Sequence, residues 1–358
     1  MNKRVRMLAV TAVTLLVSTT VIPGLYGRPA SLEWGFPEYI DAFAPYVLDV
    51  KALMVGDVEY LFVLVPHYSD NNDMGDDRDI LVTQRAGDGW AEPVRVPLTV
   101  QEPFDCAYDA STGEFLFFFR EKSWTTLGES IVISLARGNL TRPWSFQTVV
   151  ETAWRPGVTG PYDMSAVVAD DGTIDLFYCY VTGMTENLNL LYRTRYDGTA
   201  WSEPERLGVG NSPSAIRWGN GTLQVYSNLW TDLLGRQYCV DEWTVRDGSW
   251  NRTSLTTGAR SGHAEPFAFE DGEGNGYIVY NHQQCEGEGR TELLVQTRLP
   301  MGAWRQPVRV VSDMIGYADA QGAYHYGIEH PCATVRGDDI NLYYFNHGDL
   351  YTVRGRFR

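Results

Sequence analysis

The stretch that decides the fold is LLYRTRYDGTAWSEPERL, residues 190–207. Its first residues are rich in types that favour strands, and Asp197-Gly198 marks a tight turn. After the turn, Trp201 opens a second extended segment, with Pro204 three residues later. The stretch therefore predicts two strands joined by a short turn, with a Trp at the start of the second strand.

The Trp-x-x-Pro segment recurs along the chain. It reads WGFPEYI from Trp34, WAEPVRV from Trp90 and WRQPVRV from Trp304. WSFQTVV from Trp144 and WNRTSLT from Trp250 keep the Trp and the extended run without the Pro. The six Trp residues are separated by 56, 54, 57, 49 and 54 residues. A period of about 50 residues with four short strands per unit is typical of a β-propeller blade.

The number of blades follows from the strands expected nearest the axis. Six such inner strands begin near Asp49, Asp105, Asp163, Ser212, Glu265 and His330. The last unit has three strands and no Trp strand, whereas the strand around Trp34 has no unit in front of it. We therefore predict an all-β, six-bladed propeller of four-stranded antiparallel blades in residues 28–358. The N-terminal strand completes the last blade and removes an open sheet edge.

The N-terminus predicts export. Lys3, Arg4 and Arg6 precede an uncharged apolar or small stretch from Met7 to Tyr26. We interpret residues 1–27 as an export signal, which is either cleaved or kept as a membrane anchor. The protein is then expected to be a secreted or cell-surface monomer, with this segment as its only membrane attachment.

Composition excludes several classes of protein. The chain has 358 residues, 44% of them hydrophobic, which suits an ordered globular fold. Its formal net charge of -16 argues against a nucleic-acid partner, because phosphate binding needs a basic surface. The five cysteines are too scattered for a disulfide scaffold or a zinc site. Only Cys285 and Cys332 suggest a pairing, because both fall near the same expected face of the ring.

The turn before the Trp resembles the Asp-box (BNR) repeat of the sialidase superfamily, in which a hairpin reads roughly Ser-x-Asp-x-Gly-x-x-Trp. RYDGTAWSEPERL is the most similar copy, and RAGDGWAEPVRV and VRDGSW are degenerate ones. The resemblance extends over residues 31–358 at the level of repeats. It implies a propeller fold and says little about activity, because propellers host many functions.

The resemblance fails where sialidase chemistry would need it. The family's first inner strand carries an Arg that clamps the substrate carboxylate, and Leu48 stands at that position here. The Glu329–His330 region replaces the family's nucleophilic Tyr. Two features of the sialidase family are retained in this sequence. One is an acidic loop similar to the loop that bears the family's acid/base Asp, and the other is His263-Ala-Glu265-Pro, which resembles the family's Glu-bearing strand. We therefore expect a carbohydrate-active propeller that is not a true sialidase.

Candidate site residues lie where the inner strands begin and where the second strands end, on the face that carries the long loops. Carboxylates crowded around an axis repel one another, which raises some pKa values and suits acid/base chemistry. The alternative is that each Asp bonds the backbone amides of the neighbouring blade. The candidate catalytic residues are Glu265, Asp163, Asp105, Glu329 and His330. The candidate substrate-binding residues are Asp49, His67, Arg120, His263, His282 and His347.

A metal is not required by this interpretation. The acidic loop DNNDMGDD offers Asp70, Asp73 and Asp76 as oxygen ligands for Ca²⁺, but it lacks the EF-hand spacing. A solvated loop is favoured over a Ca²⁺ site, and we expect no cofactor.

Three functions remain open. The leading hypothesis is an exported glycoside hydrolase-like enzyme with paired carboxylates at the axial mouth, acting on a glycan or polysaccharide. A related version is a polysaccharide lyase that uses a His or Tyr base. The second class is a non-catalytic glycan- or protein-binding surface propeller, and a structural scaffold is the third.

Overall fold

The computed structural model describes most of the chain after residue 31. The described ranges are 32–43, 47–67, 77–125, 128–140, 144–151, 158–182, 189–230, 238–256, 261–284, 290–300, 302–314, 327–346 and 348–357. The expected export segment, the candidate Ca²⁺ ligands Asp70, Asp73 and Asp76, and Cys285 and His347 lie outside these ranges. Among the described residues, no helix is long and apolar enough to be a membrane span.

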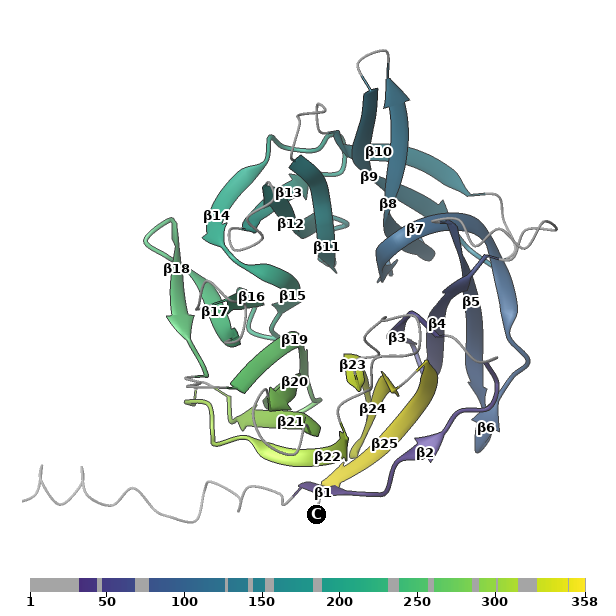
Figure 1. The fold of residues 1–358 in the computed structure, drawn as a ribbon, viewed down its shortest axis with the longest axis vertical. Coiled ribbons are helices and arrows are strands. Elements are labelled where there is room, and N and C mark those ends of the chain that lie inside the picture. The colour runs from purple at the N-terminus through teal and green to yellow at the C-terminus, as the bar shows by residue number, and fades with distance from the viewer. Residues whose placement is uncertain are drawn as a thin grey trace, which may run out of the picture.

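The described residues form strands arranged as a ring around a central axis (Figure 1). The first sheet contains β1 (Leu32–Trp34), β2 (Glu38–Tyr39), β23 (Ile328–Arg336), β24 (Asp339–Asn346) and β25 (Asp349–Phe357). A four-stranded sheet contains β11 (Val158–Val168), β12 (Ile174–Thr182), β13 (Leu190–Tyr196) and β14 (Glu205–Val209).

Two larger sheets complete the ring. One contains β3 (Asp49–Val55), β4 (Val58–Pro66), β5 (Asp77–Ala86), β6 (Gly89–Trp90), β7 (Val94–Asp109), β8 (Glu114–Thr125), β9 (Gly128–Gly138) and β10 (Ser145–Glu151). The other contains β15 (Asn211–Arg217), β16 (Leu223–Trp230), β17 (Tyr238–Arg246), β18 (Ser249–Ser254), β19 (Ser261–Glu270), β20 (Gly276–Gln284), β21 (Arg290–Arg298) and β22 (Val308–Met314).

Hydrogen bonding therefore gives four sheets in the described part of the chain, which differs from the six separate four-stranded sheets expected from the sequence. The reason lies at two junctions. β7 is one continuous strand that pairs with β5 through its first half and with β8 through its second half. β17 and β19 are joined by a single parallel pair, Tyr238 with Gly262. The all-β propeller arrangement of antiparallel strands is confirmed.

The N-terminal strand closes the ring as expected. β1 pairs antiparallel with the C-terminal strand β25, with Trp34 opposite Gly355. β2 pairs with the same strand further along. The two ends of the described chain thus lie in one sheet (Figure 1).

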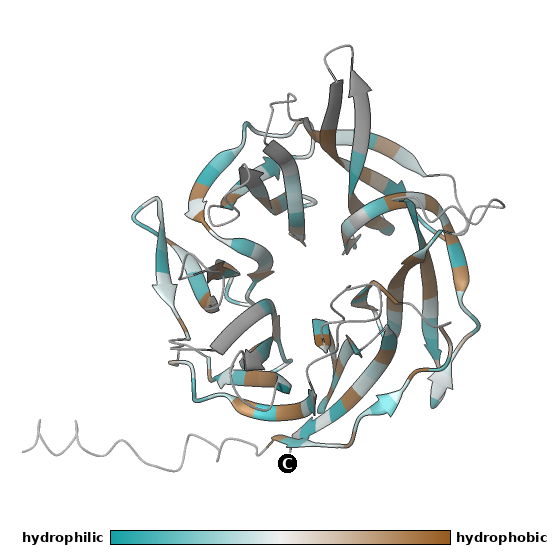
Figure 2. Ribbon diagram, in the orientation of Figure 1, coloured by the Kyte–Doolittle hydropathy of each residue, from teal (hydrophilic) through white to brown (hydrophobic). Residues whose placement is uncertain are grey.

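The cores lie between successive groups of strands. Leu116 and Phe118 of β8, for example, share a cluster with Leu176 and Tyr178 of β12. Figure 2 shows longer hydrophobic runs on β4 than on β25, where hydrophilic and hydrophobic residues alternate. Burial of one strand face against the next group is the main driving force for such packing.

The repeated Trp residues fill these interfaces. Trp201 packs edge-on against Phe118, with ring centroids 6.3 Å apart, and Trp250 packs against Phe177 at 5.7 Å. Trp304 meets Tyr226 at 6.0 Å in the same way. In each case the partner lies on the second strand of the preceding group. The predicted role of these Trp residues in packing between neighbours is confirmed.

Candidate functional site

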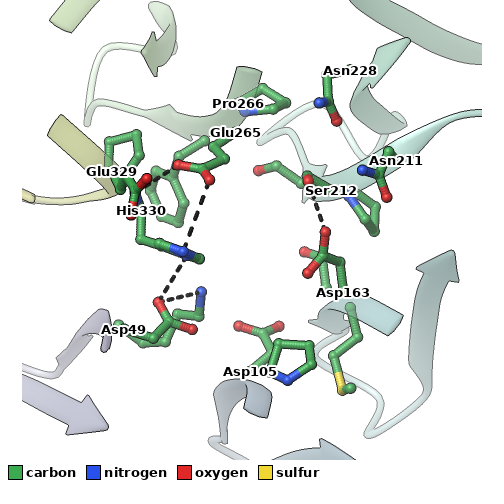
Figure 3. Close-up of a pocket in the computed structure, with 18 of the residues that line it drawn as sticks. Asp49, Asp105, Asp163, Asn211, Ser212, Asn228, Glu265, Pro266, Glu329 and His330 are labelled. Carbon is green, nitrogen blue, oxygen red and sulfur yellow. Dashed lines mark hydrogen bonds and ion pairs between the residues drawn. The ribbon is translucent and has the colours of Figure 1, made fainter. Parts of the chain in front are cut away.

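A pocket of about 440 Å³ lies at the axis, where the inner strands converge. Its lining includes the residues predicted at the starts of the inner strands: Asp49, Asp105, Asp163, Ser212, Glu265, Glu329 and His330. They come from β3, β7, β11, β15, β19 and β23 (Figures 1 and 3). The volume is within the range of small-ligand pockets. The sequence thus predicted correctly that these side chains meet.

Bulges in the inner strands position several of these residues. The register with the second strand shifts around Ser212, Glu265 and His330, and each of these residues precedes a proline. Proline has no amide hydrogen and cannot continue the ladder, so a bulge forms at this point. The φ angles are +44° at Ser212, +52° at Glu265 and +47° at His330, and Asp163 has +36°. Such left-handed conformations are costly outside glycine and cluster at functional sites.

One side of the pocket holds a chain of charges (Figure 3). Lys51 Nζ lies 3.2 Å from Asp49 Oδ1, and His330 Nδ1 lies 3.3 Å from the same oxygen. Burial alone would raise the pKa of Asp49, but Lys51 and His330 outweigh it and lower the pKa. Burial alone would lower the pKa of His330, but Glu265 and Asp49 raise it to about 10. The His330 imidazole is therefore a cation at neutral pH.

Glu265 receives several donors. Its Oε2 accepts a hydrogen bond from Asn281 Nδ2 at 3.0 Å and another from the backbone N–H of His330 at 2.8 Å. Its Oε1 lies 3.8 Å from Nε2 of His330. Its side chain keeps an exposed fraction of 26%. These donors fix the orientation of the carboxyl group, while the side chain stays accessible from the pocket.

Asp105 and Asp163 are different, because burial disfavours their charged forms. Burial raises the pKa of Asp105 to about 6, against the opposing effects of Lys51 and the Ala166 N–H, which donates to Oδ2 at 2.7 Å. Burial also raises the pKa of Asp163, and repulsion from Glu265 adds to the effect, although the Ser212 hydroxyl donates to Oδ2 at 2.7 Å. The pocket thus combines a hydrogen-bonded carboxylate with two carboxyl groups that hold protons more readily than usual.

The alternative expected from the sequence, that these carboxyl groups bond backbone amides of the neighbouring group of strands, is also observed. Asp105 bonds the backbone N–H of Ala166 on the next inner strand, β11. Glu265 bonds the backbone N–H of His330 on β23 in the same way. The catalytic and the structural interpretation of these carboxyl groups are therefore compatible. One oxygen of each side chain can join neighbouring strands while the other faces the pocket.

Three predicted substrate-binding residues do not line this pocket. His67 Nδ1 lies 3.0 Å from Asp79 Oδ1, and His282 Nδ1 lies 3.1 Å from Glu292 Oε2. Both imidazoles belong to ion-pair clusters on the second and third strands. Arg120 places its guanidinium 5.6 Å from the ring centroid of Tyr162, which itself lines the pocket.

Other candidates cannot be placed in full. The backbone of His263 lies in β19 opposite His282, but its side chain is outside the described part of the structure. His347 and the candidate Ca²⁺ ligands Asp70, Asp73 and Asp76 lie outside it entirely. Within the described ranges, no group of three or more His, Cys, Asp or Glu residues is arranged to hold a metal ion. Cys332 is a buried free thiol, and its suggested partner, Cys285, lies outside the described residues.

The pocket is also lined by residues that were not predicted from the sequence: Lys51 and three asparagines, Asn211, Asn228 and Asn281. Lys51 follows Asp49 by two residues, so strand periodicity places both side chains on the same face. Asn228 and Asn281 stand near the ends of second strands, in YSNLW and VYNHQ. This recurrence was the available signal for them.

Comparison with solved structures defines the fold class. An α-L-arabinanase from Penicillium chrysogenum in complex with arabinobiose has 13% identity and a TM-score of 0.57, over 92% of this chain and 98% of that one. A triple mutant of AofleA from Arthrobotrys oligospora has 11% identity and a TM-score of 0.56, over 93% and 88%. A mutant of the α-L-arabinofuranosidase Arb93A from Fusarium graminearum, bound to an iminosugar inhibitor, has 13% identity and a TM-score of 0.53, over 92% and 98%.

These likenesses establish a β-propeller fold and, at such identities, the fold alone. No family model matches the sequence, and no curated protein matches it. The resemblance to the sialidase superfamily is therefore supported as a propeller and not as that superfamily in particular.

Proposed function

We propose that this protein is a glycoside hydrolase-like enzyme that cleaves a neutral glycan in its axial pocket. The observation that carries the proposal is the environment of three carboxyl groups facing one cavity. Glu265 is surrounded by donors, whereas burial raises the pKa of Asp105 and of Asp163. Glycosidic bonds are cleaved by such a pair, in which one group holds a proton and the other is ionised.

The roles follow from these environments. Asp105, with a pKa raised to about 6, is our candidate for the acid that protonates the leaving oxygen, and Asp163 is the second candidate. Glu265 supplies the carboxylate that attacks the anomeric carbon or activates water. His330, with Glu329 beside it, positions Glu265 through its backbone N–H and its imidazolium.

The charge of the pocket supports a neutral substrate. Five carboxylate-bearing residues line it, Asp49, Asp105, Asp163, Glu265 and Glu329, against two cations, Lys51 and His330. Both cations are within 4 Å of Asp49 or Glu265, so neither offers a free charge to a substrate carboxylate. This disfavours a sialoside, and it disfavours the lyase alternative on uronic acids.

The similar structures add support for the class of substrate. Two of those with a TM-score above 0.5 carry the names α-L-arabinanase and α-L-arabinofuranosidase. Both names describe hydrolases of neutral pentose glycosides. Arabinose-containing glycans are therefore the first substrates to test.

A non-catalytic glycan-binding propeller is the second candidate. It is favoured by the use of Asp105 and Glu265 to bond backbone amides of the neighbouring inner strand. The same hydrogen bonds would also be present in a propeller that catalyses no reaction.

The architecture and cellular place belong to the same proposal. We propose six blades, because β7 serves two successive groups of strands and a single residue pair joins β17 to β19. Export through residues 1–27, a secreted or cell-surface location and a monomeric state are likewise proposed from the sequence.

A hydrolysis screen of the purified mature protein on neutral glycans, arabinan oligosaccharides first, tests the function. We expect release of reducing sugar, and a loss of at least about a hundredfold in turnover for Glu265→Gln. Glu203→Gln, an exposed carboxylate outside the pocket lining, is the matched control and should keep full activity. Full activity in Glu265→Gln, or hydrolysis of sialosides alone, would contradict the proposal.

A further inference from the structure

Asn228 places a buried side-chain oxygen, Oδ1, at the axial pocket, and this oxygen has no hydrogen-bond partner in the described part of the structure. The residue lies on β16, has an exposed fraction of 3%, and belongs to the pocket lining. A buried amide oxygen left unsatisfied is rare in native proteins, and each case calls for an explanation.

The equivalent asparagine on β20 is Asn281. Its Nδ2 donates to Glu265 Oε2 at 3.0 Å, while its Oδ1, like that of Asn228, has no hydrogen-bond partner among the described residues. The residue that corresponds to Glu265 next to Asn228 is Ser212. Its shorter side chain donates to Asp163 Oδ2 at 2.7 Å and leaves the Asn228 amide without that contact.

The pocket is therefore divided into two sides (Figure 3). One side carries Asp49, Glu265, Glu329 and His330. The opposite side carries Asn211, Ser212 and Asn228, which are uncharged, next to Asp163. Uncharged amide and hydroxyl groups next to a carboxyl group match the hydroxyl groups of a sugar ring, which both donate and accept hydrogen bonds.

We propose that Asn228 is a specificity-determining residue that hydrogen-bonds a ring hydroxyl of a neutral sugar bound beside Asp163. This inference rests on the proposed function for the class of ligand. A buried amide built to bond a hydroxyl rejects analogues that lack it, because the amide then stays unpaired. The Asn228 amide thus selects sugars with a hydroxyl at one ring position.

Calorimetric titration of four probes tests this contact: arabinobiose, xylobiose, cellobiose and mannobiose. The Glu265→Gln background prevents turnover. We expect at least one probe to bind, and Asn228→Ala to weaken its binding tenfold or more. Asn189→Ala is the matched control, because the Asn189 Oδ1 is likewise buried without a partner but lies outside the pocket lining. It should leave the affinity unchanged.

Deoxy analogues of the bound disaccharide identify the hydroxyl. One analogue should lose tenfold or more in affinity for the Asn228 form and lose nothing further when Asn228 is Ala, a non-additivity that reports direct contact. Thermal unfolding of Asn228→Ala should stay close to that of the parent, because Asn228 Oδ1 makes no hydrogen bond to any described residue. Should Ala fail to fold, Asn228→Ser provides the second variant.

The outcomes separate the two proposals. Sugar binding that depends on Asn228 without any hydrolysis supports this inference and contradicts the hydrolase. Hydrolysis that is unaffected by Asn228→Ala overturns this inference alone. Failure of all four probes to bind overturns both.

Discussion

Nδ1 of His330 lies 3.3 Å from Oδ1 of Asp49, so the last inner strand, β23, is tied to the first, β3, inside the pocket. The backbone N–H of the same histidine donates to Glu265 on β19. One residue therefore contributes both to closure of the ring and to the orientation of the candidate catalytic carboxylate. If the proposed function holds, a change at His330 should therefore affect stability and activity together.

The first prediction concerns the pH dependence of this contact. The folded pKa of His330 is raised to about 10, above its usual 6.5, so its stabilisation is complete below pH 6.5 and is lost as the pH rises towards 10. His330→Asn keeps a residue that tolerates the left-handed backbone. We expect it to destabilise the protein at pH 6 by about 1–2 kcal/mol, after allowance for solvent screening.

Urea unfolding of both proteins at pH 6, 8 and 10 measures the effect. The difference in free energy of unfolding should shrink as the pH rises. A difference that is constant between pH 6 and 10 would show that the His330 charge does not stabilise the fold.

The second prediction is that Asp105→Asn stabilises the protein at neutral pH. The folded pKa of Asp105 is about 6, above its usual value of 3.8, so the folded protein loses stability as the pH rises between these values. Asn cannot ionise, and its side-chain oxygen can still accept the Ala166 N–H. We expect a gain on the order of 2–3 kcal/mol at pH 7.5 that vanishes near pH 4.

Asp109 provides a control of opposite sign. Its pKa is lowered because hydrogen bonds from Ser111 and Thr112 outweigh the effect of burial. Asp109→Asn should therefore destabilise the protein at pH 7.5, and less so as the pH falls. Chemical denaturation across pH 4–8 checks both variants, and a destabilised Asp105→Asn at pH 7.5 would refute the buried-charge argument.

The third prediction concerns ring closure. Gly355 lies opposite Trp34, and a Cβ added to it would meet the Trp34 ring at 2.7 Å. Gly355→Ala should therefore displace the closing strand and cost about 1–3 kcal/mol. Gly89→Ala, where a Cβ would meet nothing within 4 Å, is the control. Equal melting temperatures for the two variants would argue against closure through β1.

The fourth prediction concerns the buried carboxylate of Glu59, which hydrogen-bonds residues of β23 and β24 and so links the first and the last groups of strands. Glu59 on β4 accepts hydrogen bonds from Thr334, from Asn341 at 3.1 Å and from Tyr343 at 2.6 Å. Glu59→Ala would leave these buried donors without their acceptor, at a cost of about 2–4 kcal/mol.

Differential scanning calorimetry measures that loss. Glu203→Ala, at an exposed position, should change the melting temperature little. A Glu59→Ala protein as stable as this control would show that the cluster contributes nothing to closure.

The resemblance to the Asp-box shows why a local motif leaves the family open. Asp197 Oδ1 accepts hydrogen bonds from the backbone N–H groups of Thr199 and Ala200, at 2.8 and 2.9 Å. This is an Asx-type turn that serves any hairpin needing a tight reversal. The motif therefore predicted the hairpin correctly, but a turn made by neighbouring residues says nothing about the axial site.

The number of sheets illustrates a second limit. The sequence predicted the strands and their order, because strand propensity and turn residues are local. Whether β17 bonds β19 depends on how closely Tyr238 and Gly262 approach in the folded ring. No local pattern contains that distance.

The sequence by itself determined the repeat, the all-β ring, its closure by the strand of Trp34 and the meeting of Asp105, Asp163 and Glu265 at the axis. Periodicity and register suffice for these, since they place equivalent residues at equivalent positions. Only the tertiary structure decided that the pKa values of Asp105 and Asp163 are raised, that His330 pairs with Asp49, and that Asn228 Oδ1 has no partner among the described residues. These properties depend on burial and on contacts between residues far apart in the chain, which exist only after the ring has closed.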